Sequence, residues 1–351
     1  MSSSALSAAT LRPTWAEISL GNARSNLKKI KAGLPPGCQL MFVVKANAYG
    51  HGATQLSLLA QKEKLCDRLG VSCIEEGIAL RKAGVKLPIL VLGSIYPFSG
   101  FAEALRNKLA VTVASAEAAR QLNTAAAKAK LKAVCHLKVD TGMGRIGMRR
   151  PSAVKTALKI TALEHVHLEG IYTHLSSADS DPAYTRLQLK HFNETLDNCA
   201  ALGVKASLYH AANSFACVHY PDSLFNMVRP GLACYGLLDG FAPALSLKSR
   251  IVFLKDVRSG SSIGYGRTFR AARQLRLATL PIGYADGYSR RLSNAAEVLV
   301  RGKRCRVAGL VSMDMIVADV TGVPNASVGD EAVLIGAQGG DSISAQDLAQ
   351  W

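Results

Sequence analysis

The sequence predicts an α/β protein: a (β/α)8 TIM-like barrel followed by a C-terminal domain made only of β-strands. Two changes of pattern indicate this division. Between about residues 40 and 240, short apolar segments alternate with amphipathic helical segments, as in repeated strand–helix units. After about residue 245, alternating strand-like runs are separated by Gly, Pro, Asn and Asp. We therefore expect the barrel over residues 1–244 and the β domain over residues 245–351, with a segment near residues 12–20 packed on the second domain.

Short apolar segments bounded by turn-forming residues predict the strands. Eight strand–helix units in about 200 residues match the size of a (β/α)8 barrel. The predicted barrel strands are Leu40–Val44, Leu69–Ser72, Ile89–Leu92, Leu109–Val113, Ala133–Val139, Leu168–Thr173, Lys205–Tyr209 and Leu232–Tyr235. The predicted strands of the second domain are Arg250–Val257, Leu275–Leu280, Glu297–Arg301, Arg304–Val311, Ile316–Val320 and Glu331–Ile335.

Local signals place three of the helices between the barrel strands. Ser72 and Glu75 have the spacing of an N-terminal capping box, and Gly84 stands where that helix would end. The alanine-rich stretch Ser115–Lys130 has strong helix propensity. The segment Pro151–Leu163 begins with a proline, which suits the first turn of a helix.

Length and composition allow a large hydrophobic core. The 351 residues are 49% hydrophobic, but no apolar run approaches the roughly 20 residues that span a bilayer. Residues 1–10 have neither a basic start nor a long apolar segment, so we expect no signal peptide. The eight cysteines are scattered without the spacing of a metal site. We therefore expect a cytoplasmic protein with free thiols and no bound metal.

The formal net charge of +17 raises the question of nucleic-acid binding. However, the basic residues are spread over the whole chain. The densest stretches, Arg267–Arg276 and Arg301–Arg306, lie in strand-like sequence without a series of aromatic side chains for base stacking. We therefore expect no nucleic-acid partner and no membrane partner, and we interpret the charge as a basic surface that attracts anionic ligands.

The most specific local motif is the decapeptide Val43–Gly52, with the sequence VVKANAYGHG. An apolar run ends in Lys45, and a turn that contains Gly50 follows. A lysine at the end of a buried strand loses hydration, which favours its neutral, nucleophilic form. Such an amine can form a Schiff base with an aldehyde or a carbonyl substrate. For an isolated Val-Val-Lys segment, a lysine that reaches solvent would be the ordinary interpretation.

Polar residues recur where the predicted strands end. In a barrel, the C-terminal ends of the strands converge on the face that carries the active site. Any one of these residues alone is compatible with ordinary loop polarity, but their joint placement predicts a site. They are Lys45 after the first strand, Lys138, Asp140 and Arg145 at and after the fifth, His174 after the sixth, His210, Asn213 and Ser214 after the seventh, and Arg229 and Gly231 before the eighth.

Several segments together resemble alanine racemase, a pyridoxal-phosphate enzyme with a barrel and a C-terminal β domain. They occur in the family's order and cover nearly the whole chain. The first two are highly specific, whereas an Arg-Pro-Gly segment alone would be weak. The matching segments are Val43–Gly52, Lys138–Gly147, Thr173-His174, Ala212–Ser214, Val228–Gly231, Gly264–Gly266, Pro281–Tyr288 and Met313-Asp314.

The resemblance implies an isomerase that interconverts L-alanine and D-alanine with pyridoxal 5'-phosphate and supplies D-alanine for cell-wall peptidoglycan. Lys45 would hold the cofactor covalently and act as one base. Racemisation needs a second base on the opposite face of Cα, and Tyr265 would be that base. In the family this tyrosine comes from the partner subunit, so the resemblance implies a homodimer with shared active sites.

The resemblance also implies roles for the other site residues. Arg229 would face the pyridine nitrogen, where a cation disfavours ring protonation and suppresses transamination, and His174 would orient Arg229. Arg145 would hold the cofactor's phenolic oxygen and the substrate carboxylate. Lys138 matches a lysine that is carbamylated in many family members. The alternative is that Lys138 is unmodified and paired with a carboxylate. Cofactor contacts would also come from Tyr49, Asn213, Ser214, Gly231 and Leu232, and substrate contacts from Met313 and Tyr284.

Two departures from the family pattern affect these expectations. Leu310 stands where many members have an arginine at the outer entrance, so we expect substrate entry to be tuned differently. Family members usually continue to a tyrosine that contacts the phosphate, whereas the sequence given ends at Trp351. If the chain was shortened there, we expect it to retain the cofactor less well.

Other functions stay open at this point. A serine or broad-specificity amino-acid racemase could use the same scaffold. A non-catalytic pyridoxal-phosphate carrier would lack the C-terminal β domain and its tyrosine. A decarboxylase on a related barrel fits less well, because the sequence has neither the glycine-triplet phosphate loop nor the Glu-Pro-Gly-Arg-type segment expected there.

Overall fold

The structure is a computed structural model that describes residues 11–351. The expectation of no signal peptide falls on residues 1–10 and lies outside the described residues. The chain divides into two compact units. The barrel unit comprises Leu20–Ala244, and the β unit comprises residues 11–19 and 245–351. No helix within residues 11–351 is both long enough and apolar enough to cross a membrane.

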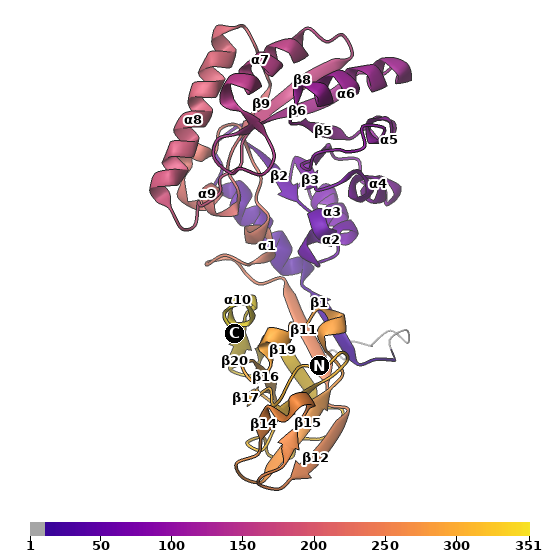
Figure 1. Cartoon of the computed structure of the whole chain (residues 1–351), viewed down its shortest axis with the longest axis vertical. Helices are drawn as coiled ribbons and strands as arrows, with labels where there is room; N and C mark the ends of the chain where they lie inside the picture. Colours follow the sequence, from indigo (N-terminus) through magenta and orange to yellow (C-terminus); the bar gives the residue numbers. More distant parts are fainter. Residues whose placement is uncertain (1–10) are drawn as a thin grey trace. The chain divides into compact units, whose positions relative to one another are not determined.

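The barrel unit contains eight parallel strands in a nearly closed ring, which confirms the predicted fold class (Figure 1). Their spatial order is β10-β2-β3-β4-β5-β6-β8-β9. Between β9 and β10 the Asn226 side chain accepts from the Tyr209 amide at 2.7 Å and donates to the Ser207 carbonyl at 2.8 Å. The strands are β2 Gln39–Val43, β3 Arg68–Val71, β4 Ile89–Val91, β5 Ala110–Val113, β6 Ala133–Asp140, β8 Val166–Tyr172, β9 Leu208–His210 and β10 Met227–Val228, and β7 Met148–Arg149 pairs with β6.

The predicted eighth strand is wrong. Leu232–Tyr235 forms a 3-10 helix, η2, and the eighth strand is β10, which pairs in parallel with Gln39 and Leu40 of β2. A short buried apolar run does not distinguish strand from helix, and Pro230 just before it has no amide hydrogen to continue a ladder. Arg229 therefore follows its strand, so it stands at the same C-terminal face as the other strand-end residues.

Helices alternate with the barrel strands along the chain (Figure 1). The alanine-rich stretch and the proline-led segment are helical as predicted. The predicted capping box is wrong: Cys73, not Ser72, is the N-cap and makes no side-chain cap hydrogen bond, and Glu76, not Glu75, accepts from the Ser72 amide at 2.7 Å and hydroxyl at 3.0 Å. The helices are α1 Leu20–Ala32, α2 Lys45–Tyr49, α3 Ala53–Lys62, α4 Ile74–Lys82, α5 Gly100–Arg106, α6 Ala116–Ala129, α7 Arg150–Thr161, α8 Pro182–Ala201, α9 Ser214–His219 and η1 Pro221–Ser223.

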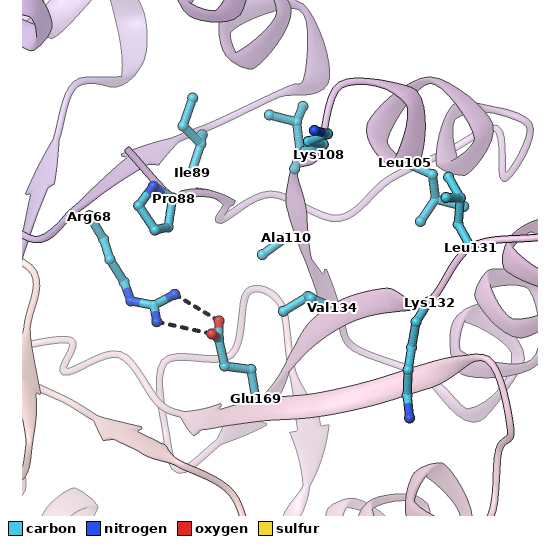
Figure 2. A pocket seen from close by; sticks show the side chains of 11 residues that line it. Arg68, Pro88, Ile89, Leu105, Lys108, Ala110, Leu131, Lys132, Val134 and Glu169 are labelled. Carbon is cyan, nitrogen blue, oxygen red and sulfur yellow. Dashed lines mark hydrogen bonds and ion pairs between the residues drawn. The ribbon is translucent and has the colours of Figure 1, made fainter. Parts of the chain in front are cut away.

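A cavity of about 250 Å³ lies at the N-terminal ends of strands β3 to β6, opposite the catalytic face expected of a barrel (Figure 2). Its lining is apolar apart from the paired Arg68 and Glu169 and the side chains of Lys108 and Lys132. Glu169 connects this cavity to the barrel interior, because its carboxylate also lies 3.0 Å from Nε2 of the buried His136.

The β unit contains antiparallel sheets, as predicted for the second domain. β1 (Thr14–Ile18) pairs with β11 (Leu245–Arg250) at the edge of the largest sheet. The predicted strand Arg250–Val257 begins too early: Arg250 is the last residue of β11, and the strand in the next sheet, β12, begins at Phe253. The remaining strands are β12 Phe253–Val257, β13 Ser262–Ile263, β14 Phe269–Arg270, β15 Leu275–Leu280, β16 Glu297–Val300, β17 Lys303–Arg306, β18 Ile316–Asp319, β19 Glu331–Gln338 and β20 Asp341–Ile343.

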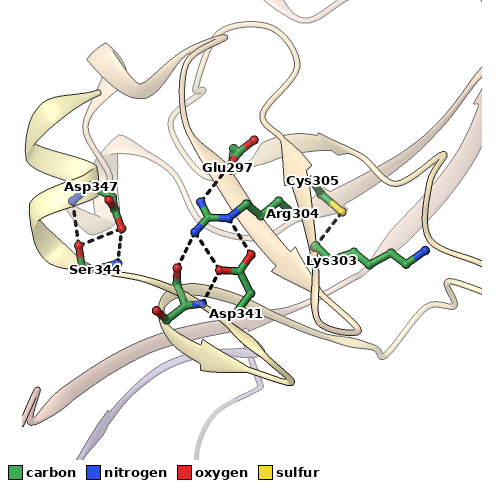
Figure 3. Close-up of polar contacts among 8 residues, drawn as sticks. Glu297, Lys303, Arg304, Cys305, Asp341, Ser344 and Asp347 are labelled. Atoms are coloured by element: carbon green, nitrogen blue, oxygen red, sulfur yellow. Dashed lines mark hydrogen bonds and ion pairs between the residues drawn. The ribbon is translucent and has the colours of Figure 1, made fainter.

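Polar contacts connect the last strands of the β unit, and a separate set caps its C-terminal helix, α10 (Ala345–Gln350) (Figure 3). Arg304 on β17 donates to Asp341 at 2.7 Å and to Glu297 at 3.0 Å. Ser344 and Asp347 form a capping box at the start of α10. These contacts fix the end of the described chain.

Candidate active site

Lys45 begins the predicted turn, in which Gly50 and Gly52 have positive φ values of 82° and 88° as expected, but the left-handed backbone starts before these glycines. The residues Ala46, Asn47, Ala48 and Tyr49 all have φ between 51° and 55°. This backbone region is unfavourable for residues with a Cβ, so four in succession persist only when neighbouring contacts hold them. One such contact is the 2.6 Å hydrogen bond from the Ala46 amide to the Glu76 carboxylate. The lysine is therefore displayed on a rigid turn.

The amines of Lys45 and Lys138 have lowered pKa values. Burial lowers the pKa of Lys45, the Arg145 charge lowers it further, and Glu76 acts in the opposite direction. Burial, with the charges of Arg229, Arg145 and Lys45, lowers the pKa of Lys138 to about 8. Lys138 is only 4% exposed, and its Nζ lies 5.3 Å from the centre of the Tyr172 ring. Both amines thus reach the neutral, reactive form more easily than ordinary lysines do.

Arg229 is buried and held by neutral acceptors. It donates to the Thr173 carbonyl at 2.8 Å, to the Ala211 carbonyl at 3.1 Å and to His210 Nδ1 at 2.7 Å. His174 Nδ1 lies further away, at 3.5 Å. Burial lowers the pKa of Arg229 to about 10, which leaves it protonated at neutral pH. Its charge is therefore available to whatever it faces at the barrel mouth.

From the sequence, we expected His174 to orient Arg229 and assigned no role to His210 or Tyr172. The structure places His210 in the shorter contact, and the Tyr172 ring stacks on His210 with centroids 4.6 Å apart. Burial and the Arg229 charge lower the pKa of His174 to about 3, so this histidine is neutral. Their position at strand ends could have indicated that Tyr172 and His210 belong to the site, because they are the last residues of β8 and β9.

A second group of residues forms a small cradle beside Lys45. Ser214 Oγ accepts from the amides of Gly231 at 2.8 Å and Ala233 at 3.2 Å, which leaves its hydroxyl hydrogen for another acceptor. A Cβ atom at Gly231 would lie 2.6 Å from Tyr49 Oη, so only glycine fits. Leu232 begins η2 next to this glycine. Asn213 is the N-cap of α9, where its side chain accepts from the Ala216 amide at 3.0 Å and fixes the turn that carries Ser214.

Arg145 stands in the loop after β6. Asp140, the last residue of that strand, accepts from the amides of Gly142 at 3.0 Å and Gly144 at 3.1 Å, and these bonds fold the loop. Arg145 lies near enough to lower the pKa of Lys45, Lys138 and His174. The barrel mouth thus gathers the four cations Lys45, Lys138, Arg145 and Arg229.

The remaining predicted residues lie in the β unit, and three adjacent loops carry them. Tyr265 lies in a turn whose flanking glycines both have positive φ. The Tyr284 amide donates to the Ser312 carbonyl at 3.0 Å, which holds Tyr284 beside Met313. We call Tyr265, Tyr284 and Met313 the loop cluster; their exposed fractions are 72%, 43% and 54%. These side chains lack the packing that their size would allow.

The barrel residues fit pyridoxal phosphate by the chemistry of their side chains. The cofactor needs an amine for its aldehyde and donors for its phosphate. Lys45 supplies the amine, while the Ser214 hydroxyl and the Gly231 cradle supply room and a donor. Four cations at one barrel mouth repel each other, and an anionic phosphate or carboxylate would relieve that repulsion.

The comparisons with known proteins agree along the whole chain. A family model for the N-terminal domain of alanine racemase matches residues 18–239, and one for the C-terminal domain matches residues 244–351. The alanine racemase of Symbiobacterium thermophilum is 45% identical over 350 residues, which cover 97% of this chain and 92% of the relative.

Solved structures give the same result. An alanine racemase of Clostridium difficile 630 has a TM-score of 0.91 at 37% identity, over 97% of this chain and 90% of that one. The enzyme of Bacillus anthracis, solved with bound L-Ala-P, has a TM-score of 0.90 at 35% identity, over the same fractions. This chain therefore belongs to the alanine racemase family of pyridoxal-phosphate-dependent isomerases, which interconvert L-alanine and D-alanine.

Proposed function

We propose that Lys45 and Tyr265 are the two bases of this racemisation, and that they come from different copies of the chain. The observation that carries this proposal is the half-buried Lys45 amine, with its lowered pKa, at a barrel mouth lined by cations. Bound pyridoxal phosphate supplies the electron sink that acidifies the Cα proton of alanine. Lys45 then exchanges a proton on one face of Cα, and Tyr265 exchanges one on the other.

The residues of the barrel mouth hold the cofactor and the substrate. Tyr49, Asn213, Ser214, Gly231 and Leu232 would hold the phosphate of the cofactor, and Arg229, oriented by His174 and His210, would interact with its pyridine nitrogen. A buried cation there keeps that nitrogen unprotonated. Arg145 binds the phenolic oxygen of the cofactor and the substrate carboxylate.

Lys138 is carbamylated in the working enzyme. Its pKa of about 8 leaves a usable neutral fraction at cellular pH. The neutral amine adds to carbon dioxide and releases a proton, so a buried cation becomes an anion. This anion offsets the surrounding positive charge and positions Arg145.

A homodimer completes the site. The loop cluster is exposed in one copy of the chain, and tyrosine and methionine side chains of this kind are enriched at protein interfaces. Tyr265, Tyr284 and Met313 of one copy would close the entrance above the barrel of the other and favour a substrate with a small side chain. We place this enzyme in the cytoplasm, in keeping with its eight free cysteines, where its D-alanine supplies peptidoglycan synthesis.

The test follows the optical rotation of L-alanine in heavy water with the full chain and saturating pyridoxal phosphate. We expect rotation to fall to zero while deuterium enters Cα. Parallel rates with serine, lysine and arginine test the broad-specificity alternative, and we expect alanine to be fastest. A preparation that binds the cofactor but leaves the rotation of L-alanine unchanged would contradict the proposal.

A further inference from the structure

Arg229 is connected through the barrel interior to an ion pair at the other end of the strands. Its Nη1 donates to His210 Nδ1 at 2.7 Å, and His210 Nε2 lies 2.8 Å from His136 Nδ1. His136 Nε2 lies 3.0 Å from Glu169 Oε2, and Arg68 holds Glu169 with two hydrogen bonds of 2.8 and 2.9 Å. We call this series, Arg229–His210–His136–Glu169–Arg68, the histidine link.

The two ends of the histidine link determine where its hydrogens lie. A guanidinium only donates, so His210 Nδ1 must accept and His210 carries its hydrogen on Nε2. That hydrogen points to His136 Nδ1, so His136 also carries its hydrogen on Nε2. The Glu169 carboxylate accepts it. The series thus runs in one direction, from a cation through two neutral imidazoles to an anion.

The backbone of the barrel is shaped to build this series. Cys135 pairs with Leu168 and His136 with Gly170, so Glu169 is an extra residue, a β-bulge in β8. A bulge re-aims a side chain, and here the Glu169 side chain meets His136 of the neighbouring strand. A Cβ at Gly170 would lie 2.3 Å from His136 Nδ1, so the glycine makes room for the imidazole ring. A barrel interior filled by apolar side chains would need neither the bulge at Glu169 nor the glycine at position 170.

The far end of the histidine link reaches the cavity at the N-terminal ends of the strands. Figure 2 shows Arg68 and Glu169 paired at its wall, where the Arg68 side chain is 16% and the Glu169 side chain 18% exposed. A metal does not explain the grouping, because residues 11–351 contain no cluster of three or more metal-binding side chains placed to hold an ion. Small solutes can therefore reach Glu169 from the side opposite the active site.

We propose that His136, Glu169 and Arg68 are positioning residues for Arg229 and so for the reaction specificity of the enzyme. This rests on the proposed function, in which Arg229 faces the pyridine nitrogen. The histidine link keeps His210 Nδ1 free of hydrogen, so that His210 accepts from Arg229 instead of opposing it. It also keeps the Glu169 charge two imidazoles away from Arg229, so that the guanidinium remains an unneutralised cation toward the cofactor.

The central variant is Glu169→Gln, which preserves size but removes the anion. Arg68 only donates, so the carbonyl oxygen of the glutamine faces Arg68 and its NH2 group donates to His136 Nε2. Both histidines then move their hydrogens to Nδ1. His210 would present a hydrogen to Arg229 and displace it. We expect kcat to fall about ten- to hundredfold, as for other residues that orient a working group, with KM changed less than about twofold. Pyruvate formation from alanine, the transamination side reaction, should rise relative to racemisation.

The matched control is Glu194→Gln, which breaks the exposed ion pair with Arg150 on the outer helices. It should leave kcat, KM and the pyruvate fraction unchanged. A thermal unfolding curve for each variant separates loss of fold from loss of positioning. If Glu169→Gln keeps wild-type kcat and pyruvate fraction, the proposal is wrong.

A second readout does not depend on activity. With the full cofactor-loaded chain labelled with ¹⁵N-histidine, long-range ¹H–¹⁵N spectra report which ring nitrogen carries hydrogen. His136 and His210, assigned by loss of their signals in His136→Gln and His210→Gln, should both be Nε2–H. In Glu169→Gln both should gain Nδ1–H character. Finding Nδ1–H histidines in the wild-type protein would overturn the proposal.

Because the cavity is open, a small anion can take the place of the Glu169 carboxylate in a variant with a smaller side chain. Glu169→Ala leaves space for formate beside Arg68 and His136, and formate should restore kcat severalfold and lower the pyruvate fraction, with no gain in the wild type. Absence of rescue together with wild-type tautomers would count against the histidine link. Lys45→Ala separates the two proposals: if that variant still racemises alanine, the proposed function fails, whereas an inactive Lys45→Ala beside an unchanged Glu169→Gln removes only the histidine link.

Discussion

The barrel mouth and the loop cluster differ in how much of their structure each unit completes by itself. At the barrel mouth, Arg229 is 5% exposed and Lys138 is 4% exposed, and the fold supplies the contacts that hold them. In the loop cluster, Tyr265 is 72% exposed and Met313 is 54% exposed. Buried charge is unfavourable unless it is used or paired. The barrel mouth is therefore preorganised for an anionic group, whereas the loop cluster becomes part of a site only in the dimer that we propose.

The largest expected effect comes from the barrel mouth. In the proposed mechanism, Lys45→Ala removes both the amine that holds the cofactor and one base, so we expect racemisation to fall by at least about 10⁴-fold. Lys155→Ala, at an exposed lysine on α7, is the control and should retain full activity. Polarimetry with L-alanine measures both. Substantial activity in Lys45→Ala would remove the barrel mouth from the reaction.

The next effect comes from the loop cluster. Tyr265→Phe keeps the ring but removes the proton-carrying hydroxyl, so we expect kcat to fall about 10²- to 10⁴-fold. The absorbance of the bound cofactor should stay unchanged, because the barrel residues hold it. Tyr96→Phe, at a tyrosine that is 86% exposed, should have no effect. Loss of cofactor binding in Tyr265→Phe would mean that the two regions are not separate in function.

Lys138 should make the barrel less stable when it is unmodified and protonated. Its pKa is about 8 in the folded chain and about 10.4 when unfolded. Below pH 8 the lysine is charged in both states, and the buried charge destabilises the fold. Between these pH values the folded state loses its proton first, so wild-type stability rises with pH.

We therefore expect Lys138→Met to stabilise the cofactor-free protein by up to about 3 kcal/mol at pH 7, and by less as pH rises above 8. Urea unfolding in buffer free of carbon dioxide measures the difference. Lys159→Met on the surface of α7 should show no such pH dependence. If the stability gained by Lys138→Met increased with pH, the lowered pKa of Lys138 would be contradicted.

The smallest effect concerns the phosphate cradle. Gly231→Ala would place a Cβ 2.6 Å from Tyr49 Oη, so the cradle must widen. We expect the Kd for pyridoxal phosphate to rise about tenfold, which corresponds to about 1.4 kcal/mol. Gly33→Ala, where the nearest atom to the new Cβ is 3.5 Å away, is the control. Fluorescence titration of the cofactor-free protein compares the two.

The sequence predicted the parts of the barrel mouth that depend on strand ends. Lys45 and Lys138 stand at or near such ends, and the alternation of strands and helices was enough to bring them to one face. Arg229 was expected before the eighth strand, and it reaches that face because the eighth strand is β10, which Arg229 follows. The eighth strand was wrong because a short apolar run fits a 3-10 helix equally well.

What the sequence did not predict depends on backbone detail. The left-handed backbone after Lys45 begins at Ala46, ahead of the glycines that were expected to shape the turn, and one of the hydrogen bonds that hold it comes from Glu76, which is distant in sequence. The histidine link was missed because His136 and Glu169 meet through a bulge, and a bulge changes which face a residue occupies. Alternation of apolar and polar residues cannot reveal such a shift.

The central claim is that Lys45 and Tyr265 act on one substrate from two copies of the chain, and subunit complementation tests it most directly. Inactive Lys45→Ala and Tyr265→Phe proteins are mixed in equal amounts, unfolded, refolded together with pyridoxal phosphate and assayed with L-alanine. Half of the dimers then contain one of each, and one of their two sites has both residues, so we predict about a quarter of wild-type activity. A mixture as inactive as its components, with mixed dimers shown to form, would contradict the account.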